Sequence, residues 1–499
     1  MHDSPKRKVA IGIAWMTSAR AIVRALGLVS TVVLARLLIP ADFGLVAMAM
    51  AVAAGFELLT LFSFETALIR EPRITRAHYD SAWTLNALMG LAIALALAAS
   101  AVPFAAFYRE PRLETVMLMI GLKYFIDGLG NTGTVDFRRQ MEFGRDFLMQ
   151  VGPKIAGILV TIPLALWLAD YRALLCGMII SSAVSCVMSY LLHPHRPRFC
   201  LSEVGSLFRF SRWLLLNGMV SFVRVRSADF IIGRQLGPGP LGIFSVSFEV
   251  ANLPSTEMVA PINRVLFPSY VGLANDQDRL RESFASTLGL IALLILPASV
   301  GLAAVADPLV RVVLGEKWLD SIPLIDLLAL AGAANVLQTN TGSVYNAIGR
   351  PRLIALTSAI HAATLIPLLL LGTQAFGLTG AALALLVHSI GIGLPVTYLI
   401  FFASTAIRPS DVWRVCWRPV IASMLMYMAV TQFLRHVELL HGEALSTLAG
   451  LIAACILGVL SYTLAVAGLW QAAGRPEGAE PTLFTQLRGM WLRCTSRQP

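Results

Sequence analysis

Charged residues are scarce in this sequence: Asp, Glu, Lys and Arg make up only 14% of its 499 residues. A soluble globular domain has about 25% charged and about 45–50% apolar residues. Here 57% of the residues are hydrophobic, and the mean hydropathy is +0.72. This is too little charge to cover a soluble fold of this size with a polar surface. The composition therefore predicts an all-α polytopic membrane protein.

The sequence also lacks the patterns of metal, disulfide and nucleotide sites. Its cysteines form no CxxC pair and no cluster with histidine; they stand at positions 176, 186, 200, 416, 455 and 494. Neither a zinc site nor a disulfide framework is therefore expected. No Walker P-loop occurs, and no GxGxxG follows a strand. We expect no metal and no cofactor, so any transport would be driven by ions, the membrane potential or the substrate gradient.

Long apolar runs are what the chain does contain. A span of ~30 Å of hydrocarbon needs about 20 residues, and Gly, Pro and charged residues separate runs of that length along the whole sequence. The first run continues to Ile39 without a convincing cleavage site, so we interpret it as a retained span and not as a signal peptide. Fourteen spans are predicted, at roughly 11–37, 44–69, 82–107, 114–135, 147–169, 173–192, 213–236, 241–267, 284–306, 322–348, 353–375, 378–404, 415–434 and 445–470.

The net charge of +10 raises the question of nucleic-acid binding. The basic residues are dispersed between apolar runs, however, whereas a nucleic-acid-binding domain gathers them on one face. With alternate loops assigned to the cytoplasm, 25 of the 39 basic residues fall on that side and only 8 on the other. This asymmetry is what the positive-inside rule describes. It predicts no nucleic-acid partner and places both termini in the cytoplasm.

The chain contains an internal repeat. The segment ARLLIPADFGLVAM (35–48) matches GRQLGPGPLGIFSV (233–246) with an offset of 198, and NTGTV (131–135) matches NTGSV (340–344) with an offset of 209. Offsets that drift only by loop-sized amounts indicate duplication. Each copy holds six predicted spans, so the two copies are expected to be parallel repeats, an architecture of transporters whose substrate site lies between the halves. We therefore predict a lobe at 1–200, a second lobe at 201–406, two additional spans at 407–470 and a cytoplasmic tail at 471–499.

Arginines stand inside two repeat-equivalent spans. Arg20 and Arg24 are one helical turn apart in the first span, and Arg224 and Arg226 lie in the seventh. Exposing such a charge to lipid costs about 2.5–3.5 kcal/mol on insertion scales, so these groups should face a watery cavity or a partner. Guanidinium groups bind phosphate oxygens in a bidentate fork. The four arginines are predicted to bind a phosphate-bearing amphiphile in a basic cavity.

Asp229 leaves two interpretations open. It stands three residues after Arg226 and can neutralise it, which would leave Arg224 to extend toward the membrane surface. Alternatively it is a coupling residue for a transported ion, a role for which Glu57 and Glu249 are also candidates because they lie in spans that can line the same cavity.

One motif is also found in enzymes. Asp276 and Asp278 form the D-x-D spacing with which nucleotide-sugar transferases hold a metal. They precede a helix in a predicted cytoplasmic loop, where Asp is an ordinary helix starter. We therefore expect no catalytic activity.

Several segments together resemble one family: VLARLLIPADFGLVAMA, ALIREPRIT, VLFPSYVGLANDQDRLRESF, LGEKWLDSIPLI, AIGRPRL and FGLTGAALALL. Over residues of about 9 to 405 the chain resembles the Wzx-type polysaccharide flippases of the multidrug/oligosaccharidyl-lipid/polysaccharide exporter superfamily, in the colanic-acid-like branch. The resemblance implies two six-helix lobes that expose a cationic cavity alternately to each side of the inner membrane.

The same resemblance implies the cargo, an undecaprenyl-pyrophosphate-linked oligosaccharide for exopolysaccharide or lipopolysaccharide synthesis, with polysaccharide polymerase machinery as a possible partner. Arg20 and Arg24 match the placement of pyrophosphate-binding arginines in related lipid II flippases, and the last two spans match a groove for the lipid tail. Arg224 and Arg226 depart from the family pattern, so their role is inferred from the residues alone. An ion-coupled multidrug-type exporter of the same superfamily is the alternative; it would favour an acidic or aromatic cavity. The oligomeric state is not predicted.

Overall fold

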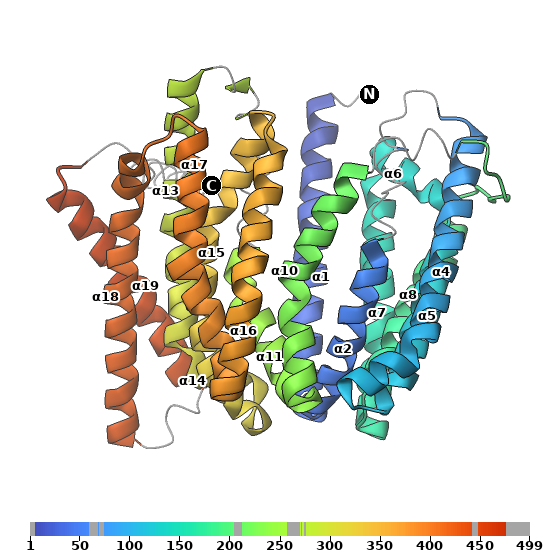
Figure 1. The fold of residues 1–499 in the computed structure, drawn as a ribbon, viewed down its shortest axis with the longest axis horizontal. Coiled ribbons are helices and arrows are strands. Elements are labelled where there is room, and N and C mark those ends of the chain that lie inside the picture. Colours follow the sequence, from blue (N-terminus) through green and yellow to red (C-terminus); the bar gives the residue numbers. More distant parts are fainter. Residues whose placement is uncertain are drawn as a thin grey trace, which may run out of the picture. The chain divides into compact units, whose positions relative to one another are not determined.

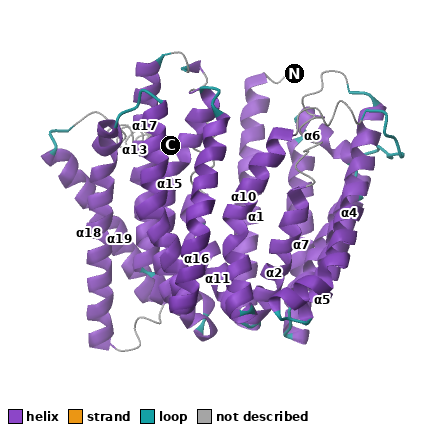
Figure 2. Ribbon diagram, viewed as in Figure 1, coloured by secondary structure: helices purple, strands orange, loops and turns teal. Residues whose placement is uncertain are grey.

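The computed structural model describes residues 5–58, 68, 74–203, 212–256, 270, 272–273, 276–441 and 448–475. Within these ranges the chain forms helices and connecting turns, with no β-strand among them (Figures 1 and 2). The prediction of an all-α protein is confirmed. Contacts divide the chain into two compact units, Met1–Ser245 and Val246–Pro499.

The first unit is built from long helices joined by short turns: α1 (Pro5–Leu37), α2 (Pro40–Glu57), α4 (Arg76–Tyr108), α5 (Arg112–Gly128), η2 (Thr132–Thr134), α6 (Val135–Arg139), α7 (Phe143–Leu168), α8 (Arg172–Leu192), α10 (Arg212–Leu236) and the start of α11 (Pro238–Ala251). Helix α4 packs against α5, α7 against α8, α1 against α7, and α10 against α2 and α4. The contact boundary at Ser245 lies beyond the predicted lobe boundary at residue 200 because α10 packs on these helices.

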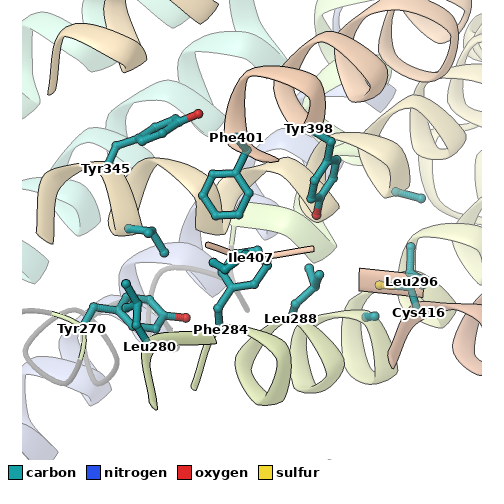
Figure 3. Packing of buried hydrophobic residues seen from close by; sticks show 13 residues of the cluster. Tyr270, Leu280, Phe284, Leu288, Leu296, Tyr345, Tyr398, Phe401, Ile407 and Cys416 are labelled. Carbon is teal, nitrogen blue, oxygen red and sulfur yellow. The ribbon is translucent and has the colours of Figure 1, made fainter. Parts of the chain in front are cut away.

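The second unit contains α13 (Gln277–Ala304), α14 (Ala306–Leu309), η3 (Val310–Leu314), η4 (Glu316–Ser321), α15 (Ile322–Ala347), α16 (Pro351–Val387), η5 (His388–Gly393), α17 (Leu394–Ser404), α18 (Pro409–His441) and α19 (Leu448–Ala472). Its core is aromatic at one end, where Phe284 and Tyr345 lie with ring centroids 4.9 and 5.5 Å from that of Phe401 (Figure 3). Helix α18 packs along α13 and α19. The two helices predicted to lie outside the repeat are thus attached to this unit.

Helix α16 reverses direction near its middle. Phe376 and Gly377 leave the helical region, and Gly377 has φ +60°, which glycine adopts without the steric penalty of a side chain. After this turn the two limbs pack so closely that a Cβ added at Gly380 would overlap the carbonyl oxygen of Gly372. The turn falls between the predicted spans 353–375 and 378–404, so α16 is a helical hairpin.

Ten helical segments among the described residues are long and apolar enough to cross a membrane. One of them, Pro351–Ser404, contains the hairpin. Helices α5 and α11 are shorter, with 17 and 14 residues, and α10 carries several charged residues. The chain is a multi-pass helical membrane protein, and the number of fourteen spans stays a prediction.

Repeat-equivalent glycines meet in the first unit where α2 crosses the start of α11. A Cβ added at Gly44 would overlap the carbonyl oxygen of Pro238, and one added at Gly242 would overlap that of Pro40. Small residues allow two membrane helices to approach this closely. Gly44 pairs with Gly242, and Pro40 with Pro238, in the repeat of offset 198. The contact is therefore reciprocal, and a local two-fold axis passes between the two glycines.

Candidate functional site

Helix α1 carries Arg20 and Arg24 on one face. Arg20 is exposed and Arg24 is half-buried. Gly27, one turn further along the same stripe, faces helix α7: a Cβ added there would lie 4.0 Å from Cε of Lys154. A third cation therefore lies against the arginine-bearing face of α1. This position of Lys154 could not be predicted from the sequence, because it depends on how α7 is rotated against α1.

The second pair of arginines lies on α10, with both side chains partly buried. Nη1 of Arg226 is 3.1 Å from Oδ2 of Asp229, and the Asp229 side chain is only 14% exposed. This i, i+3 ion pair is the one that the sequence suggested. Arg224 is displaced by about 200° around the helix from Arg226, given 100° per residue, and it projects from a different face. Arg226 is thus neutralised by Asp229, whereas Arg224 points away from this pair.

A cavity of about 250 Å³ with both polar and apolar lining residues opens among α2, α4 and α5. Glu57, from the end of α2, hydrogen-bonds the hydroxyl of Tyr124. Nζ of Lys123 lies 2.8 Å from Oδ2 of Asp127 and 4.1 Å from the centroid of the Tyr124 ring. Arg226 is close enough to Tyr124 to interact with it electrostatically. Glu57 and Arg226, both predicted as site residues, therefore belong to one electrostatic cluster.

A smaller cavity of about 170 Å³ adjoins the first and shares Asn86 and Asp127 with it. Its other lining groups are mainly hydroxyls and amides, from Asn131, Thr132, Thr134, Ser182, Ser185 and Ser189. Asn131 is the first residue of the repeated NTGTV block, and its backbone N–H donates to Oγ of Ser189. The block thus positions a polar lining inside the first unit.

Histidines and carboxylates lie in contact at one end of this unit. Nε2 of His195 lies 3.2 Å from Oδ1 of Asp80, and Nε2 of His193 lies 3.5 Å from Oδ2 of Asp136. The Asn131 amide donates to the His195 carbonyl at 2.9 Å. Burial lowers the pKa of His195, and the nearby Asp80 carboxylate opposes that shift only in part. The segment after α8 is thereby held against α6 and the start of α4.

Asp42 organises the opposite end. Its Oδ2 accepts the backbone N–H of Ile39 at 3.1 Å, and its carboxylate also accepts a hydrogen bond from the backbone of Tyr171. Arg112 and Asp170 are near enough to interact with it electrostatically. The turns after α1, α4 and α7 therefore meet at this end.

The remaining predicted residues lie apart from these clusters. Glu249 is exposed on α11, in the second unit, and its relation to the arginines stays a prediction. Asp276 caps α13 by accepting the backbone N–H of Arg279 at 3.1 Å, as expected of a helix starter. Asp278 is exposed in the first turn of that helix. Among the residues that the structure describes, no group of three His, Cys, Asp or Glu side chains is arranged to hold a metal.

Comparisons with known proteins give the chain its relatives. A family model described as "Polysaccharide biosynthesis protein" matches residues 33–323. The "Lipopolysaccharide biosynthesis protein WzxC" of Escherichia coli K12 is 26% identical over 78% of this chain and 80% of its own length. The "Succinoglycan biosynthesis transport protein ExoT" of Rhizobium meliloti is 23% identical over 92% of this chain and 93% of its own.

Among solved structures, the lipid II flippase MurJ in an inward closed conformation matches with a TM-score of 0.72. The match covers 93% of this chain and all of the other, at 15% identity. At this identity the likeness is one of fold.

Proposed function

The chain belongs to the polysaccharide biosynthesis protein family, and we propose that it is a flippase of the bacterial inner membrane. Its cargo would be an undecaprenyl-pyrophosphate-linked oligosaccharide repeat unit, which it moves to the periplasmic face for exopolysaccharide or lipopolysaccharide synthesis. It would act as a transporter without an enzymatic step.

One observation carries this proposal: arginines lie within membrane helices of a chain that shares its fold with a lipid II flippase. A pyrophosphate has several anionic oxygens, and guanidinium groups match their geometry. The arginine stripe of α1, extended by Lys154, supplies such groups on one face. Charged side chains within a membrane need a polar partner that keeps them from contact with lipid, and the headgroup of the cargo is such a partner.

We propose three further features, from the duplication, the family resemblance and the positive-inside rule. Two parallel lobes would expose the basic cavity alternately to each side of the membrane. Helices α18 and α19 would form the groove for the polyprenyl tail, and both termini would be cytoplasmic. A multidrug-type exporter is less favoured because cationic drugs would be repelled by Arg20, Arg24 and Arg224.

Reconstituted protein tests the proposal directly. Purified protein in liposomes would be given a fluorescent polyprenyl-pyrophosphate oligosaccharide, and transfer between leaflets would be followed by quencher accessibility. We expect Arg20→Ala and Arg24→Ala to insert normally and to lose most of the transfer rate, and Arg20→Lys to retain part of it. Arg112→Ala is the matched control, because Arg112 pairs with Glu110 at the start of α5.

Loss of transfer in both alanine variants, with the control unaffected, supports pyrophosphate binding by α1. Full transfer in both would contradict that role. No transfer by the unaltered protein under any imposed gradient would contradict the proposed function itself.

A further inference from the structure

The two adjoining cavities of the first unit have a lining that suits hydroxyl groups. The smaller one lies among α4, α5, η2 and α8, of which α5 packs against both α4 and α8 (Figure 1). Most of its surface is polar, and its lining includes an amide, a carboxylate and hydroxyls, from Asn86, Asp127, Ser182 and Ser185. Ser182 is only 6% exposed. Buried polar groups need hydrogen-bond partners, so the cavity holds water or a polar ligand.

Hydrogen bonds hold the walls of this smaller cavity in place. The carbonyl of Leu129, between α5 and η2, accepts from Nε1 of Trp83 at 3.2 Å and from the hydroxyl of Tyr190 at 2.8 Å. Oδ1 of Asn131 accepts from the backbone N–H of Gly133 at 2.9 Å. Trp83 belongs to α4 and Tyr190 to α8, so both helices are tied to the same turn. The cavity is therefore preformed, as most small-ligand sites are.

The internal repeat shows that the fold does not require this cavity. Asn340 is the residue of the NTGSV block that matches Asn131 of the NTGTV block. Its side chain is fully buried, and its amide donates to the hydroxyl of Tyr270, a member of the aromatic core of the second unit, at 2.8 Å. The same block thus belongs to a packed core in one unit and to a cavity wall in the other. The cavity is therefore a local feature of the side chains of the first unit.

Volume and charge narrow the class of ligand. About 10–15 Å³ of free space holds one water, so cavities of about 170 and 250 Å³ have room for a ligand of the size of a sugar ring. A bare metal ion would leave most of this space to water. Of the described residues that line the smaller cavity, only Asp127 is charged, and Nζ of Lys123 balances it at 2.8 Å. The lining therefore suits a neutral ligand that both donates and accepts hydrogen bonds.

The larger cavity adds apolar contacts to the same site. Asn86 and Asp127 belong to both cavities, whereas Met89 and Ile93 of α4 line the larger one alone. A sugar ring has hydroxyl groups around its edge and C–H groups on its faces. It can therefore form hydrogen bonds in the smaller cavity while its C–H groups contact the apolar side chains of the larger one.

We infer that the two cavities together bind a neutral sugar residue of the cargo headgroup. Asn86 and Asp127 hydrogen-bond its hydroxyl groups from one side, the hydroxyl of Ser182 does so from α8, and Met89 contacts a face of the ring. The assignment of the sugar to the cargo rests on the proposed function. The preference for a neutral ligand with many hydroxyl groups rests on the lining alone.

The position of the site agrees with this role. Asn131, in the wall of the smaller cavity, donates to the carbonyl of His195, at the end of the unit that the positive-inside rule assigns to the cytoplasm. The headgroup of the cargo would enter from that side. Tyr124 lines the larger cavity and interacts electrostatically with Arg226. A sugar bound here therefore lies beside a residue that is predicted to bind the cargo.

Binding of two lipid probes tests the site. Purified protein in nanodiscs would be titrated with a fluorescent polyprenyl-pyrophosphate oligosaccharide whose first sugar is neutral, and with the same polyprenyl pyrophosphate without sugar. We expect Asn86→Leu and Ser182→Ala each to weaken binding of the sugar-bearing probe about two- to tenfold, as the loss of a hydrogen bond does, and to leave the sugar-free probe unaffected. Equal losses for both probes, or no loss for either, would overturn the site.

A variant that fills the cavity distinguishes bound sugar from bound water. Ser185→Leu should weaken the sugar-bearing probe about tenfold or more, because the added side chain overlaps the ligand, whereas a cavity that holds only water would show no loss. Ser181→Ala is the matched control on the same helix, since Ser181 faces α7: a Cβ added at Gly157 would lie 3.1 Å from its Cβ. Ser182→Ala removes a single oxygen atom and keeps the test valid if Ser185→Leu does not fold.

The charge of the bound sugar gives an independent test. A probe whose first sugar is a uronic acid should bind the unaltered chain several-fold more weakly than the neutral probe, because Asp127 repels it and balances the charge of Lys123. Asp127→Asn removes the carboxylate that balances Lys123, so the difference between the two probes should shrink or reverse. The same difference in both proteins would contradict the preference for a neutral ligand.

Transport separates failure of the site from failure of the proposed function. In liposomes we expect Asn86→Leu and Ser182→Ala to transfer the sugar-bearing cargo more slowly than the unaltered chain, and Ser181→Ala to match it. Full transfer and unaltered binding in both site variants would overturn the site and leave the flippase function intact. Absence of transfer by every protein would contradict the function, and the two-probe titration would still decide the site.

Discussion

At the scale of single residues, the crossing of α2 and α11 leaves no space for larger side chains. Gly44 and Gly242 each lie against a proline carbonyl of the other helix, with no space for a methyl group. We expect Gly44→Ala and Gly242→Ala each to destabilise the protein by about 1–3 kcal/mol, the usual penalty of overpacking, although alanine is the better helix former. A lowered melting temperature in detergent would show this.

Gly342→Ala is the matched control for these substitutions. Gly342 is helical, in α15, and a Cβ added there would meet no atom within 4 Å. It should leave the melting temperature unchanged or raise it slightly. Equal effects at all three glycines would contradict the close crossing.

The stability of the folded protein should depend on pH through His195. In the folded protein, burial holds the pKa of His195 below its usual value, whereas the unfolded chain has the ordinary pKa of about 6.5. The contribution of the neutral ring to stability is therefore complete above the unfolded pKa and is lost as the pH falls below it. Between about pH 7.5 and pH 5.5 we expect the melting temperature of the unaltered protein to fall further than that of His195→Gln. Parallel curves would contradict the shift.

At the scale of elements, an ion pair joins the start of α18 to α13. Asp411, near its start, accepts two hydrogen bonds from Arg281 of α13 and one from the backbone of Arg408. Asp411→Ala removes both the bridge and the cap, so we expect faster proteolysis near residue 408 and a lower melting temperature. Arg279→Ala, on the same helix, removes only an exposed pair with Asp276, and such pairs contribute little. Similar behaviour of the two variants would argue against the bridge.

The helices also show which contacts could be predicted from the sequence and which could not. Local signals gave the turn at Phe376–Gly377, the cap at Asp276 and the i, i+3 pair of Arg226 with Asp229, because each depends on residues close in the chain. His361 and His388 are 27 residues apart in the sequence, and their ring centroids lie 5.4 Å apart only because the α16 hairpin closes. Lys154 reaches the arginine stripe of α1 only through the packing of α7. Contacts of this kind depend on helix rotation, which periodicity alone does not fix.

At the scale of the molecule, the first unit sorts its turns by charge. The end at which His193 and His195 meet Asp136 and Asp80 gathers the turns that the charge count assigned to the cytoplasm. The end organised by Asp42 gathers the turns assigned to the opposite side. The alternation predicted from basic residues therefore agrees with the spatial grouping of turns in this unit. Which end faces the cytoplasm stays a prediction of the positive-inside rule.

Reporter fusions decide the orientation. A green fluorescent protein joined after residue 475 folds only in the cytoplasm, and alkaline phosphatase joined there is active only in the periplasm. We expect fluorescence and no phosphatase activity at this position, and the reverse for fusions made after Glu110, in the turn that the Asp42 end holds. Phosphatase activity at the C-terminal position would place the basic turns outside. In that orientation the arginines of α1 would be reached from the periplasmic side first. They would then no longer explain transport of the cargo from the cytoplasmic face outward.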